Sequence, residues 1–338
     1  MPSPISGAAA REYHAAGYHL ARGFFDPEEI DLLKRSARAD NELDKRSFGR
    51  ADGEGGVVRL SLWNHPGDGI YGMFARCVRV VRSAEQLLGG EVYHYHSKMI
   101  LKDAKVGGAW AWHQDYGYWY QNGVLTPNLV SVFIAVDPCT RENGCLQVVK
   151  NSHHAGRVNH VLTGDQAGAD RERVEEMLKR PDAFPLVYVT MDPGDALFFH
   201  SNLLHRSDHN KSDSPRWAMI CCYNAARNNP YRAHHHPFYT LLEKVPDTAI
   251  KAAGDKAKPK TDFASFVQKG DDRLKLLERA DKLPDLQSDF ASSKYRMLMQ
   301  KSQELTAGKS GQMSGKRLEQ ILKEMQRQVV GLIKIKLN

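Results

Sequence analysis

The chain has 338 residues, 41% of them hydrophobic and 9% aromatic, and its 47 Lys and Arg against 40 Asp and Glu give a formal net charge of +7. This composition excludes a disordered protein and is sufficient for one large hydrophobic core or two small ones. No run of about eighteen apolar residues occurs, and the first residues lack the basic and apolar regions of a secretory signal, so we expect no transmembrane segment and a cytoplasmic location.

The charge is distributed unevenly along the chain. Residues 251–338 contain 19 Lys and Arg against 11 Asp and Glu, an excess of +8, so residues 1–250 together carry −1. We therefore expect no nucleic-acid partner for the first 250 residues. The five cysteines are odd in number and show no C-x-x-C spacing, which indicates reduced thiols rather than disulfides or a thiolate zinc site.

The first elements in chain order are two helices with a short strand between them. Residues 8–17 and 26–40 are predicted helices, and residues 17–20 a strand. The second helix has Asp26 in the N-cap position, Pro27 at the first helical position and two acidic residues in its first turn, which is typical of a helix start. Residues 47–56 are charged and rich in glycine, which predicts a mobile loop near the entrance of a site.

Strands dominate the middle of the chain. Apolar residues recur every three to four positions from 70 to 88, which predicts one helix before them. Strands are expected at residues 92–101, 110–115, 129–136 and 217–224, and residues 164–180 are interpreted as an insertion with one helix that acts as a lid. Many short strands separated by turns predict a mainly β fold with flanking helices, a double-stranded β-helix (jelly roll, cupin-like).

The stretch from residue 110 to residue 120 reads W-A-W-H-Q-D-Y-G-Y-W-Y and contains a candidate metal site. Side chains repeat every two residues along a strand, so His113 and Asp115 are expected on the same face, where they can bind one ion together. Two histidines and one carboxylate leave the other positions of an octahedral Fe(II) open for a co-substrate and O₂. An H-x-D triplet alone is weak, because it is expected by chance about once in a chain of this size.

The order and spacing of further motifs strengthen this interpretation. After His113 and Asp115 come a buried strand, the segment E-N-G-C-L-Q-V at 142–148, the segment G-D-A-L-F-F-H at 194–200, and His205 with Arg216 eleven residues later. In this order the motifs resemble those of the phytanoyl-CoA dioxygenase family of non-haem Fe(II)/2-oxoglutarate oxygenases. The resemblance covers about residues 12–232.

The resemblance implies a role for five residues. His113, Asp115 and His205 would bind Fe(II), and Arg216 with Ser207 would bind the distal carboxylate of 2-oxoglutarate, for which a guanidinium group offers a bidentate match. His200 is the alternative third ligand, but His205 has the family's spacing to the arginine. Where the family often has glycine after this histidine the chain has Arg206, and whether that side chain points outward or reaches a substrate stays open.

The implied function is hydroxylation of an unactivated C–H bond of a small-molecule metabolite, with O₂ consumed and succinate and CO₂ as co-products. Two other classes remain open at this point: a cupin-type metalloenzyme that does not use 2-oxoglutarate, and a non-catalytic barrel that serves as a binding module. The aromatic residues from Tyr116 to Tyr120 could line a substrate cage or simply pack. Outside the pattern lie further histidines that we do not expect to bind metal: His153, His154, His160, His234, His235 and His236.

The last part of the chain has a different composition. Residues 1–250 are predicted to form the catalytic domain, and residues 251–338 a basic, mostly helical extension that follows a linker at 256–260. Its apolar residues from Leu318 to Leu332 have helical spacing and could dock on the domain, mediate self-association or contact a membrane surface.

Overall fold

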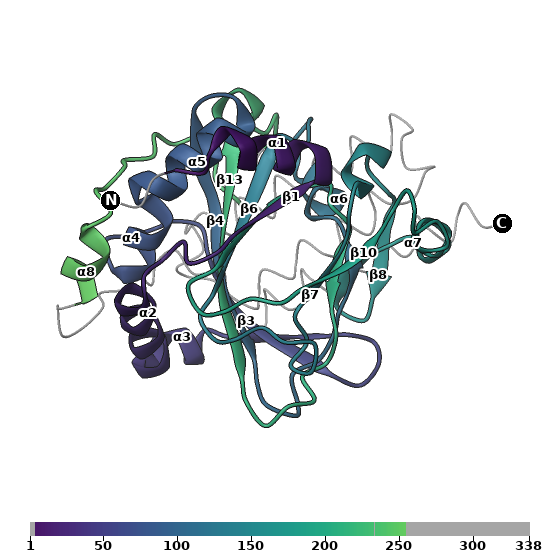
Figure 1. Ribbon diagram of the computed structural model, residues 1–338, viewed down its shortest axis with the longest axis horizontal. Coiled ribbons are helices and arrows are strands. Elements are labelled where there is room, and N and C mark those ends of the chain that lie inside the picture. Colours follow the sequence, from purple (N-terminus) through teal and green to yellow (C-terminus); the bar gives the residue numbers. More distant parts are fainter. Residues whose placement is uncertain (1–3, 233, 255–338) are drawn as a thin grey trace, which may run out of the picture. The chain divides into compact units, whose positions relative to one another are not determined.

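A computed structural model describes residues 4–232 and 234–254, so most of the predicted C-terminal extension, with its apolar stripe, lies outside the described residues (Figure 1). The described part is built on two antiparallel sheets. The larger sheet has seven strands, in the spatial order β1 (Tyr18–Ala21), β11 (Ala196–His200), β6 (Leu129–Ala135), β13 (Arg216–Ala225), β4 (Val92–Lys102), β3 (Val57–Trp63) and β2 (Phe48–Ala51). The smaller sheet has four, in the order β10 (Leu186–Val189), β7 (Leu146–Val149), β12 (His205–Ser207) and β5 (Trp110–His113).

The helices lie mainly on one face of the larger sheet (Figure 1). They are α1 (Gly7–Ala16), α2 (Pro27–Ala39), α4 (Ile70–Arg76), α5 (Val78–Leu88) and α8 (Ala249–Gly254), with the short α3 (Asn41–Lys45) after α2. Met219 and Val132 of the sheet pack with Leu33 and Phe74 of the helices in one buried apolar cluster. We call this helix-covered side the outer face of the larger sheet.

The other face of the larger sheet, the inner face, packs against the smaller sheet. Alternate residues of β13 supply the two faces: Ala218, Ile220 and Cys222 belong to a second apolar cluster. That cluster also contains Leu146 and Val148 of the smaller sheet. A mainly β fold with flanking helices is thus confirmed, and two strands predicted in the sequence, 129–136 and 217–224, form the centre of the larger sheet.

The predicted start of the second helix is confirmed in detail. The Asp26 carboxylate accepts a hydrogen bond from the Glu29 backbone N–H at 2.9 Å, and the Glu29 carboxylate accepts one from the Asp26 N–H at 2.9 Å. This reciprocal capping box satisfies two backbone donors that a helix start leaves without partners. Pro27 occupies the first helical turn, as expected.

Three element predictions were wrong in part. The helix predicted at 70–88 is two helices, because Cys77 is extended (φ −60°, ψ 143°) and the Val78 N–H donates to the Val245 carbonyl at 3.0 Å. Residues 47–56 are not only a loop, since β2 lies within them and pairs with β3, which follows at Val57. The strand predicted at 110–115 ends at His113, and Asp115 begins the short helix α6 (Asp115–Trp119).

The predicted insertion at 164–180 contains the expected helix, α7 (Arg171–Leu178), and also the second strand of a two-stranded hairpin. The hairpin consists of β8 (His160–Thr163) and β9 (Gln166–Ala169). Short 3₁₀ turns lie at Tyr120–Asn122, Ser152–Ala155 and Ala226–Asn228. No helix among residues 4–232 and 234–254 combines the length and apolar character needed to cross a membrane.

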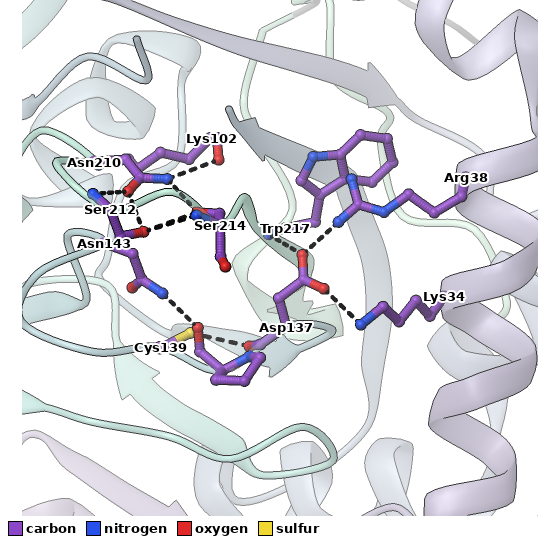
Figure 2. A network of polar contacts seen from close by, with 11 residues as sticks. Lys34, Arg38, Lys102, Asp137, Cys139, Asn143, Asn210, Ser212, Ser214 and Trp217 are labelled. Atoms are coloured by element: carbon purple, nitrogen blue, oxygen red, sulfur yellow. Dashed lines mark hydrogen bonds and ion pairs between the residues drawn. The ribbon is translucent and has the colours of Figure 1, made fainter. Parts of the chain in front are cut away.

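A polar network joins the start of β13 to helix α2 (Figure 2). The buried Asp137 carboxylate accepts hydrogen bonds from the Trp217 backbone N–H at 2.9 Å and from Arg38 Nη2 at 2.6 Å, and it pairs with Lys34 at 3.0 Å. Arg38 also stacks on the Trp217 ring at 3.7 Å. Helix α2 is therefore anchored beside the residue that begins β13, Arg216.

Candidate active site

The structure brings His113, Asp115 and His205 together. One potential ligand atom from each lies within 4.8 Å of the others, and this is the one such group of at least three His, Cys, Asp or Glu side chains found in the described part of the chain. His113 at the end of β5 is the direct cross-strand neighbour of His205 on β12, and their ring centroids are 4.0 Å apart. A cross-strand pair therefore supplies the two imidazoles, while Asp115 comes from the first turn of α6 rather than from the strand.

The turn between His113 and Asp115 is held by the fully buried Gln114. Its side-chain amide donates to the carbonyls of Gly156 and Asn202 at 2.8 and 2.7 Å, and its Oε1 accepts from the Val158 N–H at 2.7 Å. The Gln114 backbone N–H donates to Nε2 of His160 at 2.8 Å. His160 thus supports this turn, and its Nδ1 is 2.8 Å from the Val158 carbonyl.

Hydrogen bonds orient both imidazoles for metal binding. Nδ1 of His113 is 2.8 Å from the Ala111 carbonyl, and Nδ1 of His205 is 2.9 Å from the Leu203 carbonyl. A carbonyl oxygen only accepts, so each Nδ1 carries the proton and each Nε2 keeps a free lone pair. Such a hydrogen bond from the second nitrogen is typical of metal-binding histidines.

The Asp115 carboxylate is oriented in a similar way. Ser131 Oγ on the inner face of β6 donates to Asp115 Oδ2 at 2.7 Å. The other oxygen, Oδ1, lies 3.8 Å from His113 Nε2. One carboxylate oxygen is therefore occupied by a hydroxyl group, and the other faces the two imidazoles.

The charge state of the two imidazoles favours a cation between them. Burial lowers the pKa of His113 well below its usual value, and the neighbouring His205 lowers it further. Burial also lowers the pKa of His205, although Asp115 opposes this shift. Both rings are consequently neutral near pH 7, which is the form that coordinates a metal.

His200 is not part of this group. It ends β11, its Nδ1 accepts from the Asn202 N–H at 3.0 Å, and its ring lies 5.3 Å from that of His153. His153 and His154 in turn bond through Nε2 to the backbone carbonyls of His14 and Ala15. These histidines fasten the end of α1 to the Ser152–Ala155 turn.

A second group of polar residues lies where β4 ends and β13 begins. Arg216 and Lys102 are direct cross-strand neighbours, and both are buried, with 1% and 0% of their surface exposed. Arg216 donates from Nη2 to the Gly144 carbonyl at 2.8 Å, whereas its Nε has no hydrogen-bond partner among the described residues. Lys102 Nζ donates to Ser207 Oγ at 2.9 Å and also to the Asp208 carbonyl.

This second group is suited to an anion. Burial lowers the pKa of Lys102 well below its usual value, and the charge of Arg216 lowers it further. Burial also lowers the pKa of Arg216. Two buried cationic groups side by side destabilise each other unless a negative charge joins them. Because Lys102 Nζ donates to Ser207, the Ser207 hydroxyl proton remains available for a carboxylate.

Sequence reasoning missed Lys102 and Lys98. Both lie on β4, where a lysine near the end of an otherwise apolar strand resembles a surface residue. By strand alternation, however, Lys98 and Lys102 share a face with the apolar Ile100, and this pattern could have indicated that they lie on the inner face. The positive charge of Lys98 contributes to the lowered pKa of both His113 and His205.

The structure answers the question about Arg206. His205 and Ser207 are buried on one side of β12, while Arg206 points to the other. There its guanidinium group bonds to Gln147 Oε1 at 3.2 Å and to Asp208, and stands over the Trp112 ring at 5.5 Å. This side chain is thus held on the outside of the smaller sheet.

The aromatic residues after Asp115 divide into two kinds. Tyr116 and Trp119 are buried, and the Tyr116 hydroxyl donates to the Val124 carbonyl at 3.2 Å. Trp119 packs edge-on against the rings of Tyr95 at 5.3 Å and His96 at 5.5 Å. Tyr120 is 46% exposed. Packing explains Tyr116, whereas Trp119 stands one helical turn after Asp115, near the metal-binding group.

The chain is similar in sequence to known enzymes. A family model described as phytanoyl-CoA dioxygenase (PhyH) matches residues 13–218. L-proline trans-4-hydroxylase from Streptomyces griseoviridis is 33% identical over 277 residues, which is 75% of this chain and 98% of the relative. Ectoine dioxygenase from Sphingopyxis alaskensis is 26% identical over 241 residues, covering 67% of this chain and 78% of the relative.

Solved structures with a similar fold agree with these matches. The crystal structure of EctD from S. alaskensis with 2-oxoglutarate and 5-hydroxyectoine superposes with a TM-score of 0.61 at 23% identity, over 72% of this chain and 88% of that one. The epimerase SnoN in complex with Fe³⁺, alpha ketoglutarate and nogalamycin RO gives a TM-score of 0.56 at 20% identity, over 78% of this chain and 95% of that one. At these identities the similarity concerns the fold.

Proposed function

The chain belongs to the phytanoyl-CoA dioxygenase family and is an iron- and 2-oxoglutarate-dependent hydroxylase of a small molecule, and we propose that its substrate is a small free amino acid, with L-proline as the first candidate. The support for this substrate class is the L-proline trans-4-hydroxylase, which is matched over 98% of its length at 33% identity. The ectoine dioxygenases match at 26% identity or less and also act on a small compound.

Within this function, His113, Asp115 and His205 are the ligands of Fe(II). The observation that carries the assignment is the convergence of their donor atoms within 4.8 Å, with both Nε2 lone pairs free and one carboxylate oxygen turned toward them. Two imidazoles and one carboxylate suit non-haem Fe(II) and leave coordination positions open. Bound Fe(II) with 2-oxoglutarate and O₂ supplies the oxidising power for hydroxylation, with succinate and CO₂ as products.

The residues Arg216, Lys102 and Ser207 bind the distal carboxylate of 2-oxoglutarate. Within the described part of the chain Arg216 Nε has no partner, Lys102 is a buried cation, and Ser207 Oγ accepts from Lys102 and so keeps its own proton for a ligand. One carboxylate accepts hydrogen bonds from all three and neutralises the excess positive charge. Ser207 stands two residues after His205 on β12, which fixes the spacing between this carboxylate site and the iron ligand.

The fold that carries these residues is a double-stranded β-helix, or jelly roll, made of the two packed sheets. It places the reacting groups between apolar layers, where a low dielectric environment strengthens each charge-assisted hydrogen bond. We assign it to a catalytic domain of residues 1–250, with residues 251–338 as a separate extension. Helix α7 and the β8–β9 hairpin are the proposed lid.

Two other function classes explain the residues less well. A metalloenzyme that does not use 2-oxoglutarate would leave Lys102 and Arg216 buried without an anion. A non-catalytic barrel would need neither that pair nor three oriented metal-binding side chains.

Succinate formation tests the function directly. Purified protein supplied with Fe(II), 2-oxoglutarate and O₂ is expected to form succinate slowly alone and much faster with L-proline, in step with a hydroxyproline product detected by mass spectrometry. A chelator added before Fe(II) should stop both reactions. Absence of succinate under every condition would refute the function, whereas slow succinate formation that L-proline does not change would refute only the substrate.

A further inference from the structure

A buried histidine without a hydrogen-bond partner lies on the inner face of the larger sheet. His96 on β4 is 2% exposed, its Nδ1 is fully buried without a partner, and it makes no hydrogen bond within the described part of the chain. Its surroundings are rings: His236 is stacked on it at 4.4 Å with an interplanar angle of 16°, and Trp119 stands edge-on at 5.5 Å. A buried polar group without a partner is costly, so such groups are often retained for a ligand.

The sheet register places His96 close to the candidate iron site. His96 is the cross-strand neighbour of Cys222, and Cys222 is the neighbour of Ser131, which donates to the Asp115 carboxylate. Strands are about 4.8 Å apart, so His96 lies at the same level of the sheet as Ser131, about 10 Å to the side. It therefore lies on the same inner face of the sheet as Ser131, the residue that donates to Asp115.

His96 is too far from the 2-oxoglutarate site to belong to it. Lys102, at the proposed site for the distal carboxylate, is six residues farther along β4. Six residues of an extended strand span about 20 Å, which is well beyond the length of a five-carbon acid. Lys98 lies between them, so β4 runs from the co-substrate end to His96, which is level with Ser131 and the Asp115 carboxylate.

His236 is held in a defined orientation beside His96. Its Nδ1 is 2.9 Å from Asn64 Oδ1, while the Asn64 amide nitrogen donates to the His235 carbonyl. With the amide oriented in this way, Oδ1 accepts and His236 Nδ1 carries the proton. Burial lowers the pKa of His236 well below its usual value, so the ring is neutral near pH 7 and Nε2 is a hydrogen-bond acceptor.

His96 has the opposite role. Burial, and then the charge of Lys98, lower its pKa well below the usual value, so it is also neutral. A buried nitrogen without a partner is less costly as a bare acceptor than as an N–H donor. The favoured tautomer therefore carries its proton on Nε2, the nitrogen that is not sealed off. The stacked pair thus offers one donor and one acceptor, and Lys98 follows His96 by two residues on β4.

We infer that His96 and His236, assisted by Lys98, bind the zwitterionic head of the amino-acid substrate, with His96 and Lys98 on its carboxylate and His236 on its ammonium group. A carboxylate accepts and an ammonium donates, which matches the two nitrogens and the single positive charge. The edge of Trp119 contacts His96 on the side of α6, and Asp115 begins that helix. The substrate's carbon skeleton would then lie between this head site and the iron ligands. This inference rests on the proposed function.

Steady-state kinetics of the full-length enzyme with Fe(II) test it, with L-proline as the probe and L-prolinamide and N-acetyl-L-proline as its altered forms. His96→Leu and His236→Leu are each expected to raise the KM for L-proline tenfold or more, as loss of a hydrogen bond to a charged group does, while the KM for 2-oxoglutarate and the slow turnover without substrate stay unchanged. His96→Gln keeps an N–H donor and should restore most of the affinity. The exposed His154→Leu is the matched control and should behave as the wild type.

The altered substrates separate the two histidines. The wild type should have a higher KM for L-prolinamide and for N-acetyl-L-proline than for L-proline. His96→Leu should lose its preference for L-proline over L-prolinamide, and His236→Leu its preference over N-acetyl-L-proline. An unchanged KM for L-proline in both leucine variants, or an equal rise in the KM for 2-oxoglutarate, overturns the inference. Wild-type turnover of 2-oxoglutarate that L-proline does not stimulate overturns it as well, whereas absence of any 2-oxoglutarate turnover refutes the proposed function instead.

Discussion

The two faces of the seven-stranded sheet have the same backbone but opposite chemistry. The outer face presents Met219, Val132 and Phe198 to the helices and is apolar. The inner face also contains buried apolar residues, but it carries Lys102 and Arg216 as well. Strand alternation explains how one sequence supplies both faces. Apolar burial on the outer face supplies stability, whereas the buried polar groups of the inner face are costly, and we propose that they are retained for ligands.

Removal of an iron ligand should have the largest effect. Asp115→Ala and His205→Ala are expected to abolish Fe(II)-dependent succinate formation and to lower bound iron in metal analysis, because each removes one of only three proposed ligands. His200→Ala is the control, since that ring contacts His153 rather than the metal-binding group. Loss of iron in His200→Ala with retention in His205→Ala would overturn the ligand assignment.

A substitution on the outer face should lower the stability of the fold and leave co-substrate binding unchanged. Phe198 is 0% exposed and packs edge-on against Phe24 at 5.4 Å. Phe198→Ala should lower the free energy of unfolding by about 3–5 kcal/mol, as for other buried phenylalanines, and leave the KM for 2-oxoglutarate unchanged at low temperature. Urea unfolding followed by circular dichroism measures the first quantity. A changed KM with unchanged stability would mean that the two faces are not separate in function.

Acid should destabilise the fold through buried histidines away from the iron site. Burial lowers the pKa of both His94 and His200 to about 3, against about 6.5 for an unfolded chain. Between these values the unfolded state binds more protons, so stability is complete above pH 6.5 and falls as the pH decreases toward 3. Each histidine should lower the free energy of unfolding by about 2 kcal/mol between pH 6.5 and pH 5. His200→Gln should reduce the slope by one proton; an unchanged slope would exclude His200 as a source.

Substitutions of Arg216 and Lys102 test whether the inner face binds 2-oxoglutarate. Arg216→Ala should raise the KM for 2-oxoglutarate tenfold or more, since each charge-assisted hydrogen bond contributes about 1.5–3 kcal/mol. Lys102→Met should weaken the binding of 2-oxoglutarate to a similar extent. Without ligand, this variant should have the same or a higher melting temperature, because an apolar side chain of similar length replaces a buried cation beside Arg216. A large loss of stability in Lys102→Met would show that the pair serves the fold rather than the co-substrate.

Local signals in the sequence predicted the parts of the structure that depend on neighbouring residues. The Asp26 cap needs only Pro27 and Glu29, and the strand at 129–136 is a continuous apolar run. The order of motifs also predicted which histidine joins His113 and Asp115, although it placed Asp115 on a strand instead of at the start of α6. The assignment of iron and 2-oxoglutarate to these residues stays a prediction that the variants above test.

Features that depend on distant contacts were missed. The break at Cys77 results from a hydrogen bond between Val78 and Val245, which no local periodicity contains. Lys102 appears in the sequence as an ordinary strand-end lysine, and only pairing with Arg216 shows that it is buried. The partnership of His96 with His236 likewise joins residues 140 positions apart. Long-range pairing decides such positions, and a single sequence does not record it.

The smallest effect on the active site is expected from removal of the C-terminal extension. A chain ending at Gly254 keeps both faces of the sheet and all the proposed ligands, and its formal net charge is zero instead of +7. Its KM for 2-oxoglutarate and its iron content should equal those of the full chain, while any salt-dependent attraction of the full chain to anionic vesicles should disappear. The melting temperature provides the decisive control. An unchanged melting temperature with a smaller oligomer on a sizing column would assign the extension to self-association. A melting temperature lower by many degrees would instead show that the apolar residues from Leu318 to Leu332 pack on the domain. Each buried apolar side chain contributes about 1.5–3 kcal/mol before the loss of entropy is subtracted.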